Sequence, residues 1–220
     1  MIIENKWTLE IFYTFIISLI CMIIVLRTDK FFKLSSHQGI RYFRNAFFFY
    51  GIAFIARYIF EIFSNFPVSY ASAAQIIFEY FFVMAGFFLF YSLVWKKFEL
   101  NHKYTSSLFN SKIIIFHMIA AVIALFDFLW QTYFFMFFSQ IIIFAYAAVI
   151  AYMNYKKEKD RKKFSKFYFI AIILSLAAWI LNLLAASYFA WNKWVLIGIG
   201  IINIIFFLLI LYGVVKVTRK

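Results

Sequence analysis

The chain has 220 residues, of which 66% are apolar and 25% aromatic, while only 14% are charged. A soluble domain of this length needs far more polar surface, so the composition excludes one and indicates an integral membrane protein. The formal net charge of +13 at pH 7 does not indicate nucleic-acid binding, because the aromatic residues that would accompany such a surface lie in the apolar runs.

Apolar runs of about 20 residues, the length that crosses a bilayer as a helix, recur along the whole chain. They predict an all-α bundle of seven transmembrane helices that occupies residues 1–220 as a single domain. The predicted spans are residues 7–26, 40–63, 72–95, 112–130, 132–153, 165–187 and 193–215. The fourth and fifth come from one run about twice the length of a single span, which must fold back, and we place the turn around Trp130 to Tyr133.

Each predicted span carries small or polar side chains at helical spacings, which predicts one face toward the bundle interior and large Phe and Ile residues toward lipid. In the fifth and seventh spans, these residues fit equally well a simple role in packing the helices together. In chain order the faces are Glu10, Thr14, Ser18 and Cys21; Ala46, Tyr50, Ala53, Arg57 and Glu61; Ser72, Gln75, Glu79 and Gly86; His117, Ala120, Ala124, Asp127 and Gln131; Gln140, Ala147 and Ala151; Tyr168, Ala171, Ser175, Ala178, Asn182 and Ala185; and Gly200 and Asn203.

The second span contains "YGIAFIARYIFEIF", where Arg57 and Glu61 stand one helical turn apart. One interpretation is that Arg57 snorkels to the headgroups. Helical side chains lean toward their own N-terminus, however, and here that direction leads into the membrane. We therefore expect Arg57 to be buried in the bundle and paired with Glu61 and with Glu79 or Glu10.

Basic residues predict the orientation. Only Lys6 and Lys193 flank the spans on one side, whereas the loops and the tail on the other side are strongly basic. The positive-inside rule places this basic side in the cytoplasm, with the N-terminus outside and the C-terminus inside. The residues on the basic side are Arg27, Lys30, Lys33, Arg41, Arg44, Lys96, Lys97, Lys103, Lys112, Lys156, Lys157, Lys159, Arg161, Lys162, Lys163, Lys166, Lys216, Arg219 and Lys220.

Charged side chains within the predicted spans concentrate in the outer half and predict a polar, net-acidic cup open to the outside. Such a cup would favour a cation or an amine, or would exchange protons. The alternative is a structural ion-pair network that fixes how the helices pack. The candidate ligand- or ion-binding residues are Glu10, Arg57, Glu61, Glu79, Asp127, Gln140, Asn182 and Asn203.

No enzyme motif is recognisable, so we expect neither a catalytic residue nor a metal or cofactor. The last span has no lysine for retinal. Membrane haem needs paired histidines, but His37 and His102 fall in predicted loops and His117 stands alone. We interpret His117 as a residue that bridges helices.

Two functions fit these features. The first is a sensor of a small ligand or ion, or an accessory membrane subunit, that acts through a cytoplasmic or membrane partner protein. The second is a proton- or cation-coupled secondary transporter of a small solute. Few Gly or Pro residues interrupt the spans, which favours the first, because transporters often break helices near the midplane. The expected localisation is the cytoplasmic membrane of a prokaryotic cell, with anionic headgroups bound at the basic loops and no nucleic acid bound.

Overall fold

The computed structural model describes residues 2–35, 37–63, 68–98, 108, 111–157, 162–188 and 193–218. These residues form seven α-helices, close to the predicted positions, and the turn between the fourth and fifth lies where the sequence predicts it. The helices are α1 (Ile2–Ser35), α2 (Gln38–Phe63), α3 (Val68–Phe98), α4 (Ser111–Trp130), α5 (Phe134–Lys157), α6 (Lys162–Ser187) and α7 (Lys193–Thr218).

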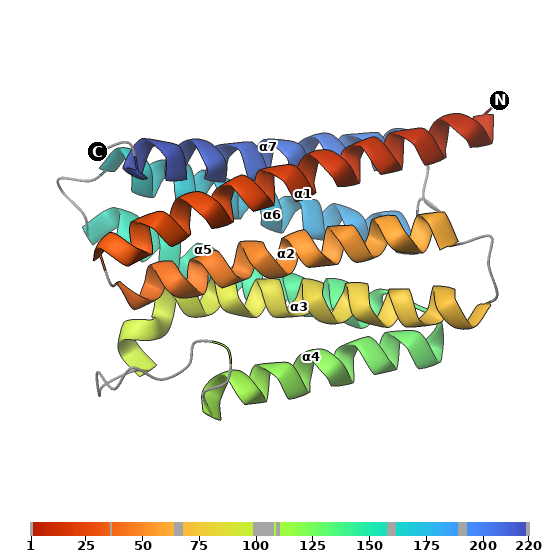
Figure 1. The fold of residues 1–220 in the computed structure, drawn as a ribbon, viewed down its shortest axis with the longest axis horizontal. Helices are drawn as coiled ribbons and strands as arrows, with labels where there is room; N and C mark the ends of the chain where they lie inside the picture. The colour runs from red at the N-terminus through yellow and green to blue at the C-terminus, as the bar shows by residue number, and fades with distance from the viewer. Residues whose placement is uncertain are drawn as a thin grey trace.

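The helices all run along the long axis of the molecule, and consecutive helices point in opposite directions (Figure 1). The N-terminus of α1 and the C-terminus of α7 therefore lie at opposite ends of the bundle. Six of the described helices are long and apolar enough to cross a membrane, which makes this a polytopic helical membrane protein. α2 is the helix that does not qualify. It carries Arg41, Arg44 and Arg57, and its crossing of the membrane stays a prediction.

The helix contacts define a ring with one helix outside it. α1 packs on α2, α2 on α3, α3 on α5, α5 on α6, α6 on α7, and α7 returns to α1. α4 contacts only α3 and α5 among the described helices, and it lies along the edge of the bundle (Figure 1). α4 thus covers the seam between α3 and α5 from the outside.

Large aromatic side chains fill the centre of this ring. Phe207 of α7 meets Phe47, Tyr50 and Phe54 of α2 in edge-on or steep ring contacts, and Phe82 of α3 meets Trp179 of α6. The prediction that the large Phe residues face lipid is therefore wrong for the Phe residues that fill this centre. A ring of six helices encloses more space than Ala and Ser side chains can fill, so aromatic side chains occupy that space.

The predicted small-residue faces are nevertheless buried where neighbouring helices touch. Side chains without bulk let two helix backbones approach closely, which is how helices associate in lipid. The fully buried examples are Ala46, Ala53, Ala120, Ala124, Ala147, Ala171 and Ala185. Small residues thus line the helix pairs, while aromatic residues fill the space in the middle.

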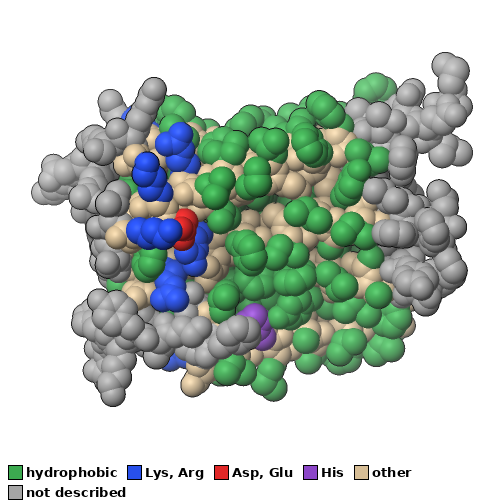
Figure 2. Space-filling model, viewed as in Figure 1, with side chains coloured by type: hydrophobic (Ala, Val, Ile, Leu, Met, Phe, Trp, Pro, Cys, Tyr) green, Lys and Arg blue, Asp and Glu red, His purple; other side chains and the backbone are tan. Residues whose placement is uncertain are grey.

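One end of the bundle is basic. Lys and Arg side chains gather at the end that holds the C-terminus, and a broad apolar band covers the middle of the molecule (Figure 2). Asp29 is the described acid at this end, where it pairs with Lys33 at 3.2 Å and with Arg44. The other end holds the start of α3 and the turn between α4 and α5. We call these the basic end and the opposite end.

Candidate ion-binding site

Glu79 of α3 is the most unusual ionisable group in the described part of the bundle. Its side chain is 0% exposed. Oε1 accepts a 2.8 Å hydrogen bond from Nε2 of Gln75, one helical turn earlier on the same face of α3. Oε2 is buried and has no hydrogen-bond partner among the described residues. A buried carboxyl group with one oxygen unpaired is costly unless a proton or a cation completes it.

Asp127, near the end of α4, is also 0% exposed, but its oxygens are fully occupied. Oδ1 accepts hydrogen bonds from the Thr132 hydroxyl at 2.9 Å and the Phe135 amide at 3.0 Å. Oδ2 accepts one from the Met136 amide at 2.7 Å. Those amides belong to the first turn of α5, which has no earlier carbonyls to bond. Asp127 therefore caps α5 across the turn and stabilises the junction of α4 with α5.

Glu79 and Asp127 interact electrostatically across the junction of α3, α4 and α5. When both are ionised the two acids repel each other, and among the described residues neither forms an ion pair within 4 Å. A positive charge beside Glu79 would relieve this repulsion, whereas Asp127 already has its partners. The geometry therefore separates the two predicted site residues: Asp127 caps a helix, whereas Glu79 keeps one oxygen without a hydrogen-bond partner among the described residues.

Gln140 of α5 is a second buried polar group that lacks partners. It is 0% exposed, and neither its oxygen nor its nitrogen has a hydrogen-bond partner among the described residues. A Cβ atom on Gly86 of α3 would lie only 2.5 Å from the Gln140 oxygen, so the missing side chain of Gly86 makes room for the carboxamide. Gly86 follows Glu79 by two helical turns, about 10 Å along α3. The α3–α5 seam therefore holds polar groups at two depths.

Arg57 of α2 belongs to a separate group of polar residues, which includes Tyr13 of α1 and Asn203 of α7. Its guanidinium lies 5.9 Å from the centre of the Phe78 ring, and the side chain is half-buried. Arg57 interacts electrostatically with Tyr13 of α1, whose hydroxyl accepts a 3.0 Å hydrogen bond from Nδ2 of Asn203 in α7. The single cup predicted from the sequence is thus divided into two groups of polar residues.

Pairing of Arg57 with Glu79, one of the two predicted alternatives, is wrong. Arg57 lies over the Phe78 ring. Oε1 of Glu79 bonds Gln75 and its Oε2 has no hydrogen-bond partner among the described residues, so neither oxygen bonds Arg57. The side chains of Glu61 and Glu10 lie outside the described residues, and their predicted pairing with Arg57 stays a prediction. Asn182 donates from Nδ2 to the Ala178 carbonyl of its own helix at 2.9 Å.

His117 bridges elements, as interpreted from the sequence. Its Nδ1 lies 2.6 Å from the Tyr80 hydroxyl of α3, and its Nε2 lies 3.0 Å from the Leu108 carbonyl. Because a carbonyl only accepts, Nε2 carries the proton and Nδ1 accepts from Tyr80. Among the described side chains, no three His, Cys, Asp or Glu residues come together as metal ligands would.

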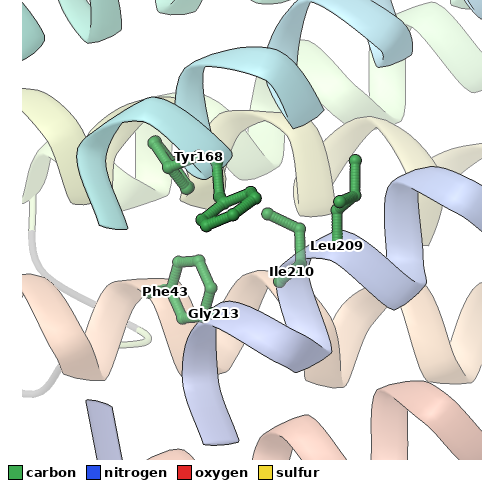
Figure 3. A pocket seen from close by; sticks show the side chains of 6 residues that line it. Phe43, Tyr168, Leu209, Ile210 and Gly213 are labelled. Carbon is green, nitrogen blue, oxygen red and sulfur yellow. The ribbon is translucent and has the colours of Figure 1, made fainter. Parts of the chain in front are cut away.

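A small cavity lies between α2, α6 and α7 (Figure 3). Its volume is about 10 Å³, room for about one water molecule. Phe43, Phe167, Tyr168, Leu209, Ile210 and Gly213 line it. Gly213 stands three residues before Lys216, so the cavity belongs to the basic end, and none of the predicted site residues contributes to its wall.

Sequence reasoning left out two side chains that matter here. Gln75 was placed on the interior face of α3 but not in the site, although a glutamine one turn before a buried glutamate is a recognisable hydrogen-bonding pair. Tyr13 directly precedes Thr14 in the sequence and is not on the face predicted for the first span. Its partner Asn203 is 190 positions away, and no local pattern connects the two.

Comparison with known proteins adds no function. No protein family, no curated protein and no solved structure matches this chain. What is established is its class, a polytopic helical membrane protein.

Proposed function

We propose that this protein is a sensor or an accessory membrane subunit that binds a small cation, or a proton, at Glu79. The observation that carries the proposal is the Oε2 of a fully buried carboxyl group, which has no hydrogen-bond partner in the described part of the chain. Ionisable residues inside a membrane bundle are costly and usually mark ion or proton sites. Glu79 supplies a carboxylate, the ligand type that hard cations prefer, and the amide nitrogen of Gln75 holds Oε1 of Glu79 in place.

The position of the site supports a role in sensing. Glu79 lies where α4, outside the ring, meets the α3–α5 seam. A charge that arrives at Glu79 changes the electrostatic interaction with Asp127, which holds the start of α5. Binding would then shift α4 and α5 relative to α3, because a ligand moves an equilibrium toward the state that it binds more tightly. A partner protein would receive this change.

The described helices are unbroken, which favours this function over alternating access, since transporters commonly use discontinuous helices at the binding site. One observation favours the alternative, a proton- or cation-coupled transporter. Gln140 places a second unpartnered polar group deeper in the same seam, as a pathway through the membrane would need. Ion or proton flux into liposomes that contain the purified protein separates the two functions, because the sensor carries none.

The test of the site is the thermal stability of the detergent-solubilised protein as the ions and the pH are varied. A cation that binds the folded state at a hundredfold excess over Kd stabilises it by about 2.7 kcal/mol. If the ligand is a proton, the native state binds more protons than the unfolded state, so stability rises as the pH falls. We expect Glu79→Gln to abolish the effect.

Asp29→Asn is the matched control, because it removes one acid at the basic end, where Asp29 already has cationic partners. This variant should keep the response of the native protein. Absence of any response to small cations or pH in the native protein would contradict the proposal, as would an equal loss in Asp29→Asn. Glu79 would then be a structural residue of the α3–α4–α5 junction.

A further inference from the structure

The outer surface of the bundle repeats one pattern on five helices. On each, a row of exposed apolar side chains at helical spacing continues into an exposed lysine at the basic end. On α1 the row is Phe12, Phe15, Leu19, Met22 and Leu26, and it continues into Lys30 and Lys33. At 100° per residue these seven positions fall within an arc of about 80°. The same face of α1 therefore changes from apolar to cationic.

The other four helices show the same pattern, whether they begin or end at the basic end. α5 and α7 reach the basic end with their last turns, whereas α4 and α6 reach it with their first turns. The lysines that terminate the exposed rows are Lys30, Lys33, Lys112, Lys156, Lys166 and Lys216. We call these six residues the lysine collar. The topology brings them from five separate helices to the same end of the bundle. On the face seen in Figure 2, Lys and Arg side chains lie at the edge of the apolar band.

Aromatic rings hold part of the collar in place. The Lys216 ammonium lies 5.5 Å from the centre of the Tyr212 ring and 5.9 Å from that of Phe167, the residue after Lys166. Cations over aromatic faces are attracted to the rings, and aromatic side chains concentrate at the interface between acyl chains and headgroups. Lys216 thus lies beside two aromatic rings at the basic end, next to the exposed apolar row of α7.

Asp29, the described acid at this end, pairs with one lysine of the collar, Lys33, and its other described partner, Arg44, is not in the collar. Both of its carboxylate oxygens are already engaged, one by Lys33 and the other by Arg44. Because the collar lysines stand in line with exposed apolar side chains, the headgroups of lipids packed against those side chains would lie within their reach. A soluble acidic partner would instead need cations that point away from the membrane.

We propose that the lysine collar binds the phosphate groups of anionic phospholipids in the leaflet at the basic end. Each lysine then contacts the headgroup of a lipid whose chains lie against the apolar row of the same helix. This site is independent of Glu79 and makes a separate claim. An anionic leaflet attracts each nearby lysine by enough to change the affinity about fivefold.

The test measures binding of phosphatidylglycerol and phosphatidylcholine to the full chain in detergent, with thermal stability and the mass of retained lipid as readouts. The native protein should prefer phosphatidylglycerol, and raising the salt concentration should weaken that preference alone. The variant Lys30→Gln with Lys112→Gln and Lys216→Gln should lose affinity for phosphatidylglycerol, by about fivefold per lysine. The corresponding Lys→Arg variant should retain it.

The matched control removes the same charge at Lys103, Lys159 and Lys163, which are not in the collar, and should keep the preference. An equal loss in this control would overturn the proposal in favour of net charge alone. An equal effect of inorganic phosphate would indicate a free anion, and binding of polyglutamate without phosphatidylglycerol would indicate an acidic protein partner; either overturns it. If the Gln variant does not fold, the salt dependence and the control variant still decide.

Discussion

At the scale of single residues, burial alone does not identify a ligand. Glu79 and Asp127 are equally buried acids at one helix junction, but Asp127 has three hydrogen-bond donors and Glu79 has one. Gln140 shows the same distinction for a neutral group, since its buried carboxamide has no hydrogen-bond partner within the described ranges. Unsatisfied hydrogen-bonding capacity, not the presence of charge, singles out the candidate ligands.

The separation of Arg57 from Glu79 leads to a prediction about their energetic coupling. The single variants Arg57→Met and Glu79→Gln and the double variant should change the free energy of unfolding additively, within about 0.5 kcal/mol, because the side chains share no partner. Arg57→Met alone should cost about 1 kcal/mol from its contact with Phe78. Denaturation in detergent measures all three.

A coupling energy above about 1 kcal/mol would show that the two charges do meet. A loss of about 3–5 kcal/mol in Arg57→Met alone would instead indicate that Arg57 has a buried acidic partner elsewhere, and Glu61→Gln or Glu10→Gln added to it should then restore part of the stability.

At the scale of elements, α4 is the helix whose placement the sequence could not supply. Its face of Ala120, Ala124 and Asp127 was predicted correctly as interior. The exposed remainder of α4 is as apolar as the lipid-facing sides of the ring helices, so nothing local shows that α4 lies outside the ring. That arrangement depends on how α3 and α5 meet, a contact between helices that are not consecutive in the chain.

The seam under α4 is sensitive to added volume. Ala124 is fully buried against the neighbouring helices, so Ala124→Leu should reduce the free energy of unfolding by about 1–3 kcal/mol through overpacking. Val122, two residues earlier, is exposed on the outer side of α4. Val122→Leu should therefore stay within about 0.5 kcal/mol of the native protein. A larger loss in Val122→Leu than in Ala124→Leu would contradict the placement of α4.

For the whole molecule, the sequence predicts which segments are helices and which small residues lie between neighbouring helices. It can do so because span length and 3.6-residue periodicity are local properties. Ala46, Ala53 and Ala147 are buried as that periodicity requires. The aromatic centre could not be predicted in the same way. Whether Phe47 or Phe207 faces lipid or the core depends on the width of the ring, which all of its helices set together. The separation of Glu79 from Arg57 could not be predicted for the same reason, while the outward opening of the predicted cup stays a prediction.

The number of membrane crossings is the central claim, because it decides which side of the membrane each end of the bundle faces. α2 is the helix in doubt, since it is not among the six that qualify by composition. Its many contacts with α1 and α3 and its buried aromatic residues place it inside the bundle. Neighbouring helices would then shield its arginines from lipid as it crosses.

The most direct measurement is cysteine labelling in intact cells with a membrane-impermeant maleimide. His37 and Tyr188 are exposed. His37 directly precedes α2 and Tyr188 directly follows α6, so the five helices α2 to α6 separate them in the chain. The native Cys21 is buried and should not react. We predict that Tyr188→Cys labels in intact cells and that His37→Cys labels only after permeabilisation. Labelling of both positions from the same side would mean that α2 does not cross the membrane, and the reverse pattern would turn the basic end outward. Either result would contradict the account.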